Sequence, residues 1–191
     1  MLRKADRNRC TPALLTFALG LALAPSLVHA QAAAPAPSAN PVSDALRQSL
    51  ARASKNMTAA AEAMPAEKFS FKPTAPEMTY GHLVVHIAET NFRFCSAVSG
   101  TPSPEQPKLT ETDSKDKLVA AVRSSFDFCS SSLAKLDDTH LADSIELFGG
   151  HSFSRAASMF ILAGSWADHY SAQSIYLRLN NLLPPSAQPQ K

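Results

Sequence analysis

Residues 154–181 read SRAASMFILAGSWADHYSAQSIYLRLNN and decide the fold more than any other stretch of the chain. From Ala156 to Ala163 the segment is apolar around most of the circumference of a helix. A helix with so little polar surface usually lies at the centre of its fold. Pro184 and Pro185 follow shortly afterwards, where a helix cannot continue. The segment therefore predicts a long, central helix near the C-terminus.

Two earlier segments have the length and period of amphipathic helices. In residues 43–64, Ser43 or Asp44 is expected to cap the start of the helix and Pro65 to end it. The apolar residues of this segment recur every three or four positions and share one face: Leu46, Leu50, Ala53, Met57 and Ala60. Residues 114–136 carry a similar stripe: Leu118, Val122, Phe126, Cys129, Leu133 and Leu136.

A further helix is expected over residues 79–99, with Thr79 as its N-cap and Gly100 at its end. Strand signals are few, and residues 146–151 fit either a hairpin-like turn or a loop. Four helices of about 20 residues favour an all-α fold, a four-helix bundle. We expect this bundle to occupy residues 43–186 as one domain with a single core.

The first 30 residues have the three-part pattern of a secretory signal peptide. Four Arg and Lys residues lie between positions 3 and 9, residues 13–27 form an uncharged apolar run, and Val28-His29-Ala30 fits a cleavage site. The alternative is an uncleaved anchor, although a membrane span needs about 20 apolar residues. We expect a periplasmic or secreted protein with no stable membrane insertion after cleavage.

Removal of residues 1–30 changes the charge of the chain. These residues hold four of the 18 basic and one of the 16 acidic residues, so the net charge moves from +2 to −1. No run of Lys or Arg remains that could neutralise several phosphates, so no nucleic-acid partner is expected. Residues 31–42 are rich in Ala and Pro and predict a disordered tether, and residues 187–191 predict a flexible tail.

Several short motifs, taken together and in order, resemble those of the DinB family. They are Lys68-Phe-Ser-Phe-Lys-Pro73, Met78-Thr-Tyr-Gly81, His86-Ile-Ala-Glu89-Thr-Asn91-Phe92, Phe94-Cys95, Trp166-Ala-Asp168-His169-Tyr170 and Tyr176-Leu-Arg178-Leu-Asn180. The resemblance covers about residues 43–186. It implies a four-helix bundle of up-down-down-up topology, with a long crossover between the second and third helices. Relatives in this family include thiol-dependent transferases and isomerases.

The resemblance also implies a divalent metal site with three histidines, one on the second helix and a His-x-x-x-His pair on the fourth. His86 and His169 fall on two of these positions, whereas Ser165 stands at the third. A serine hydroxyl is a poor ligand for zinc or nickel, which favour imidazole. His82 lies one helical turn before His86 and is the candidate replacement.

Other polar residues in these motifs are candidates for supporting roles. Asp168 and Glu89 are the carboxylates expected to orient the imidazoles. Tyr170, Tyr176 and Arg178 either line the mouth of a cavity or serve only in packing. The histidines themselves have an alternative role as ordinary hydrogen-bonded residues of a bundle core.

Cys95 and Cys129 remain after export, in a compartment where disulfides persist, whereas Cys10 leaves with the signal peptide. If their helices were antiparallel neighbours joined tightly, the two cysteines would differ in height by roughly 15 Å. If the helices run parallel, the cysteines are level, and the connection of residues 100–113 is long enough for that path. The DinB resemblance implies the parallel arrangement and with it a Cys95–Cys129 disulfide. The alternative is a pair of buried free thiols.

Three functions remain open at this point. The first is a metal-dependent bundle with hydrolase- or transferase-like activity on a small molecule, using a divalent ion such as zinc or nickel. The second is a non-catalytic bundle with a degenerate metal site, which binds a small apolar ligand or a partner. The third is a structural protein of the envelope, for which a homodimer is one arrangement. The sequence names no substrate.

Overall fold

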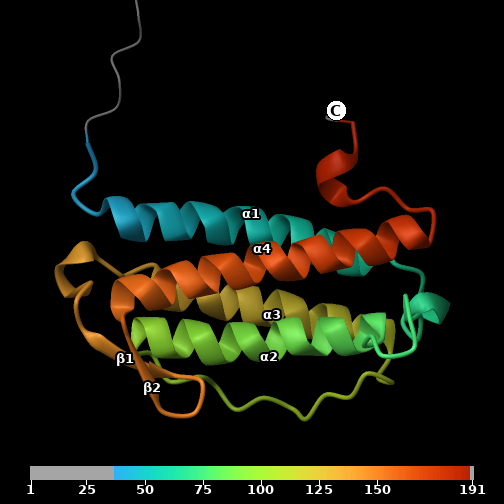
Figure 1. Cartoon of the computed structure of the whole chain (residues 1–191), viewed down its shortest axis with the longest axis horizontal. Coiled ribbons are helices and arrows are strands. Elements are labelled where there is room, and N and C mark those ends of the chain that lie inside the picture. The colour runs from blue at the N-terminus through green and yellow to red at the C-terminus, as the bar shows by residue number, and fades with distance from the viewer. Residues whose placement is uncertain (1–36, 190–191) are drawn as a thin grey trace, which may run out of the picture. The chain divides into compact units, whose positions relative to one another are not determined.

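The computed structural model describes residues 37–189. The expected signal peptide and most of the expected tether lie outside the described residues, as do the last two residues of the expected tail. Four helices pack into a bundle (Figure 1): α1 (Pro41–Ala63), α2 (Tyr80–Ser99), α3 (Lys115–Leu133) and α4 (Arg155–Leu179). Three short 3-10 helices lie between or after them: η1 (Ala66–Lys68), η2 (Asp138–His140) and η3 (Pro185–Ala187). The prediction of a four-helix bundle is confirmed.

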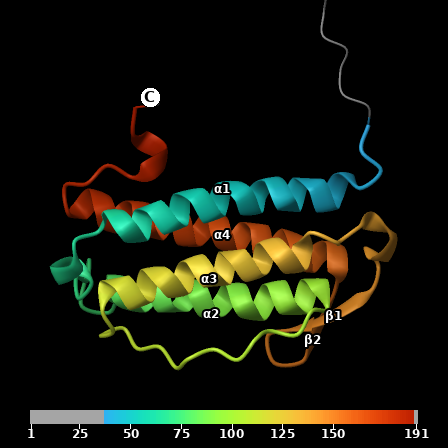
Figure 2. The same cartoon turned by 180° about the vertical axis from the view of Figure 1, so that it is seen from behind.

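The helices run in the up-down-down-up order that the resemblance implies. The colour sequence along the chain shows that α1 and α4 point in one direction and that α2 and α3 point in the other (Figure 1, Figure 2). The connection from Gly100 to Ser114 contains no helix or strand and passes back along the length of the bundle. This crossover is what allows α2 and α3 to lie parallel and in contact.

Of the two interpretations of residues 146–151, the hairpin-like turn is correct, because they lie in a β-hairpin. Strands β1 (Ser144–Leu147) and β2 (His151–Ser154) pair antiparallel, with Ser144 opposite Ser154. The turn between them has positive φ at Phe148, Gly149 and Gly150, the region in which glycine is favoured. The buried side chains of β1 pack the hairpin onto the end of the bundle beside α2 and α4.

The predicted cap of α1 is wrong. Its N-cap is Asn40, which makes no side-chain capping hydrogen bond. The carboxylate of Asp138, in η2, instead accepts hydrogen bonds from the backbone N–H groups of Val42 and Ser43, each at 2.9 Å, and from the Ser43 hydroxyl at 2.7 Å. A residue distant in sequence thus satisfies the free donors at this helix start. The other predicted cap, Thr79, accepts from the backbone of His82 as expected.

Helix α4 is less enclosed than its composition predicts. Met159, Leu162 and Trp166 are buried, but the side chain of Phe160 is 73% exposed and that of Ile175 is 54% exposed. The helix packs on α1 and α2, so its remaining side faces solvent. Within residues 37–189, no helix is long and apolar enough to cross a membrane.

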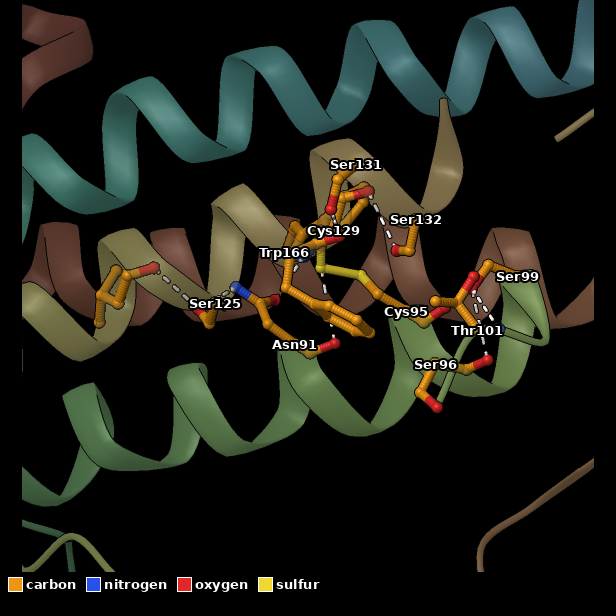
Figure 3. Close-up of a disulfide and its surroundings, with 12 residues drawn as sticks. Asn91, Cys95, Ser96, Ser99, Thr101, Ser125, Cys129, Ser131, Ser132 and Trp166 are labelled. Carbon is orange, nitrogen blue, oxygen red and sulfur yellow. Dashed lines mark hydrogen bonds between the residues drawn. A yellow bond between two sulfur atoms is a disulfide. The ribbon is translucent and has the colours of Figure 1, made fainter. Parts of the chain in front are cut away.

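Cys95 on α2 and Cys129 on α3 form the predicted disulfide, with their Cα atoms 5.2 Å apart (Figure 3). Both residues are completely buried. Next to the disulfide, the side chain of Asn91 links three helices: its Nδ2 donates to Ser125 Oγ at 3.0 Å, and its Oδ1 accepts from Trp166 Nε1 at 2.8 Å. The cross-link therefore sits in a core with specific polar contacts.

Candidate functional site

Two of the candidate metal ligands are in contact. The rings of His86 on α2 and His169 on α4 lie edge to face, with centroids 4.9 Å apart and planes at 82°. The antiparallel packing of α2 against α4 places them opposite each other. Ser165 lies one turn before His169, and its Oγ is 3.5 Å from His169 Nδ1. The serine at the expected ligand position is thus part of the same cluster.

The third candidate ligand, His82, is paired with a carboxylate. Its Nδ1 is 3.3 Å from Oε2 of Glu111, and its side chain is 56% exposed. Glu111 belongs to the crossover and also accepts a hydrogen bond from the hydroxyl of Thr79 at 2.8 Å. Sequence reasoning missed Glu111, since nothing in the crossover marks it as a neighbour of α2.

The surroundings of the two paired histidines favour their neutral form. Burial lowers the pKa of His169 from 6.5 to about 4, with a further contribution from the nearby His86. Burial also lowers the pKa of His86, assisted by the charges of His82 and Arg93. Asp168 and Glu89 are both exposed, and their charges act in the opposite direction, raising the pKa of His169 and His86 respectively. Both imidazoles are therefore uncharged at neutral pH.

The donor set around His86 and His169 does not fit a catalytic zinc site. Such a site has three protein ligands and an open position. Across residues 37–189, no group of three or more His, Cys, Asp or Glu side chains is placed to hold a metal ion. The pair offers two imidazole nitrogens, and the hydroxyl of Ser165 is a weak donor for zinc or nickel. As arranged, this cluster is an edge-to-face pair of imidazoles, one of which has the Ser165 hydroxyl 3.5 Å from its Nδ1.

A cavity of about 480 Å³ opens on another face of α4, against α1. Its apolar surface includes Ala53, Ala163 and Trp166. Tyr170 and Arg178, for which the sequence left a cavity mouth or simple packing open, line this cavity. Tyr176 does not; its hydroxyl donates to the Met78 carbonyl at 2.7 Å and its ring lies 5.7 Å from that of Tyr80.

The C-terminal segment forms one edge of the cavity. The hydroxyl of Tyr170 donates to Ser186 Oγ at 2.7 Å and accepts from the Ser186 backbone N–H at 2.9 Å. Ser186 lies in η3, which turns back from the end of α4 to contact α1 (Figure 1). Residues after α4 therefore help to build the cavity wall.

The histidine pair makes stability depend on pH. Because the folded-state pKa of His169 is below 6.5, the unfolded chain binds more protons between pH 6.5 and about 4, and stability falls as the pH falls through that window. Allowing for partial exposure of the ring, we expect His169 to account for a loss of about 1 to 2 kcal/mol between pH 7 and 4.5. Urea unfolding of metal-free protein across this range measures it.

The variant His169→Gln is expected to remove most of this pH dependence. His140→Gln serves as the matched control, because the side chain of His140 is 68% exposed. If both variants keep the pH profile of the wild type, the histidine pair is not the source of the acid sensitivity.

Comparison with known proteins supports the resemblance to the DinB family. The sequence profile of the DinB superfamily matches residues 49–171. No curated protein matches the chain. A DinB-like protein from Bacillus subtilis superimposes with a TM-score of 0.61 and 20% identity, covering 76% of this chain and 99% of that protein. A DinB-like protein from Bacillus cereus gives 0.61 and 15% identity, covering 74% and 95%.

A more distant similarity is to a mycothiol-dependent maleylpyruvate isomerase. The TM-score is 0.56 and the identity 10%, and the alignment covers 68% of this chain and 59% of the isomerase. At identities this low, the three solved structures establish a common fold.

Proposed function

This chain belongs to the DinB superfamily, and we propose that it is an exported bundle that binds a small molecule with an apolar body. In this proposal its three-histidine metal site is degenerate. The observation that carries the proposal is the cavity of about 480 Å³ between α1 and α4. Small-molecule sites in proteins are typically concave, mostly apolar and roughly 300–1,000 Å³ in volume. The cavity meets this description.

The state of the histidine cluster supports a binding role over metal catalysis. His86 and His169 contact each other, Ser165 occupies the position of the missing ligand, and His82 is engaged with Glu111. A divalent ion held by two imidazoles would lack the third protein ligand that zinc enzymes use.

Export is supported by the sequence of residues 1–30 and by the disulfide. A cross-link between two buried cysteines is typical of proteins that fold in an oxidising compartment. We therefore propose a location in the periplasm or outside the cell for the mature chain.

Two measurements on protein recovered from the periplasm without a polyhistidine tag test the proposal. We expect less than about 0.1 zinc or nickel ion per chain by elemental analysis, because two imidazoles hold such ions weakly. We also expect the neutral fluorophore N-phenyl-1-naphthylamine to bind and to raise the melting temperature with concentration, as any ligand of the folded state does. Absence of binding by this probe and by 8-anilinonaphthalene-1-sulfonate, which carries an added sulfonate, would refute the binding role.

A metal-dependent bundle is the second candidate, favoured by the contact between two neutral imidazoles. It requires His82 to leave Glu111 and turn towards His86. About one ion per chain in the wild type, lost in both His86→Ala and His169→Ala but retained in His140→Ala, would establish this candidate and contradict a degenerate site.

A further inference from the structure

We infer that the cavity between α1 and α4 selects ligands that carry an anionic group, such as an organic carboxylate or sulfonate, on an apolar body. This inference rests on the proposed binding function and adds the chemical class of the ligand. It is carried by two arginines, Arg52 on α1 and Arg178 on α4, that line the cavity from its two opposing helices.

The charge of the cavity is positive and uncompensated. Its lining contains both arginines and no Asp or Glu side chain. The rest of the lining is neutral. The mature chain as a whole carries a net charge of −1, so this concentration of positive charge does not follow from composition.

These two arginines differ from others on the surface. Arg47, Arg123 and Arg155 each form an ion pair with a carboxylate at 2.5 to 3.6 Å. Within residues 37–189, neither Arg52 nor Arg178 forms such a pair, and the one hydrogen bond of the Arg178 side chain is a long one, 3.5 Å, to the carbonyl of Ser174. Their N–H groups are therefore available to a ligand. A guanidinium can donate two parallel hydrogen bonds to a carboxylate or a sulfonate.

The same cavity offers a surface for the body of the ligand. Trp166 lies beneath the wall, 2% exposed and with its Nε1–H donated to Asn91, so it backs the cavity with apolar surface. Ala163, Ala167 and Ile175 extend this surface along α4. The Tyr170–Ser186 hydrogen bonds hold η3 beside it. An acid with an aromatic or aliphatic body matches both parts of the cavity.

Two fluorophores that differ by one sulfonate group test the inference on the purified protein. 8-Anilinonaphthalene-1-sulfonate carries the anionic group, and N-phenyl-1-naphthylamine is the same ring system without it. We expect Arg52→Gln/Arg178→Gln to weaken binding of the sulfonate about 10-fold and binding of the neutral probe less than about twofold. Circular dichroism of each variant verifies that the helices are retained.

The matched control removes the same charge elsewhere. Arg93→Gln/Arg123→Gln changes two arginines that do not line the cavity: Arg93 lies over the ring of Phe94, and Arg123 is paired with Glu62. We expect this pair to change sulfonate binding less than about twofold in buffer of about 0.15 M ionic strength, where distant charges are screened. Ala167→Phe, which fills the cavity, is expected to weaken both probes.

The outcomes distinguish the anionic preference from the binding role of the cavity. Equal weakening of the sulfonate by both arginine pairs, or no effect of Arg52→Gln/Arg178→Gln, would overturn the anionic preference while neutral binding still supports the cavity. Failure of both probes to bind, or binding that Ala167→Phe leaves unchanged, would overturn the inference and the cavity's proposed role together.

Discussion

Reduction of the Cys95–Cys129 disulfide is expected to lower the free energy of unfolding by about 3 to 4 kcal/mol. The bond closes a loop of 34 residues, and opening it returns conformational freedom to the unfolded chain. Because a loss of this size is a large part of the stability of a typical domain, the reduced protein should also melt at a markedly lower temperature. Urea unfolding with and without a reducing agent, after refolding of the reduced chain, measures the difference.

The double variant Cys95→Ala/Cys129→Ala is the control for the reducing agent itself. It should unfold at the same urea concentration under both conditions, and close to the reduced wild type. A wild-type shift of less than about 1 kcal/mol would show that the loop is already constrained in the unfolded state.

The four helices could be predicted from sequence because each repeats its apolar residues at helical spacing. Their observed ends lie within three residues of the predicted ones. The start of α1 was assigned the wrong cap because its real cap, Asp138, lies 95 residues further along the chain than Ser43. Local sequence carries no information on such a partner.

The parallel packing of α2 and α3 could not be predicted from the helical spacing of apolar residues alone. The positions of Cys95 and Cys129 distinguish a parallel from an antiparallel arrangement of α2 and α3, but they do not choose between the two. The family resemblance supplied the long crossover that the parallel arrangement needs. The backbone of the crossover lies against α2 at Gly81, since a Cβ at this position would lie 2.4 Å from the carbonyl oxygen of Glu111. The Tyr80-Gly81 motif therefore has a packing reason that appears only in three dimensions.

The candidate site was predictable in part. Sequence motifs identified His86 and His169, and the structure brings them together. The spacing of His82 correctly places it one turn from His86, but spacing does not report the competing carboxylate of Glu111. The pairing of Arg52 with Arg178 could not be predicted from sequence, because the two residues are 126 positions apart. They line one cavity only when α1 packs on α4.

Asn91→Ala is expected to destabilise the protein by about 3 kcal/mol, from an unpaired donor and a new cavity together. Asn91 is 1% exposed and holds Trp166 and Ser125 at once. Ser125 keeps its own donation to the Val122 carbonyl, so the Trp166 Nε1–H is the group left without a partner. Chemical unfolding measures the loss, and Glu89→Ala, an exposed change two positions away on α2, is expected to cost less than about 0.5 kcal/mol.

A double-mutant cycle isolates the contribution of the indole hydrogen bond. Trp166→Phe removes the N–H, so Asn91→Ala should cost less in that background, with a coupling of about 1 to 2 kcal/mol. Additive effects within about 0.5 kcal/mol would mean that Asn91 acts through packing alone. A clear coupling would assign Asn91 and Trp166, both residues of the family motifs, to the polar core that orients the wall of the cavity.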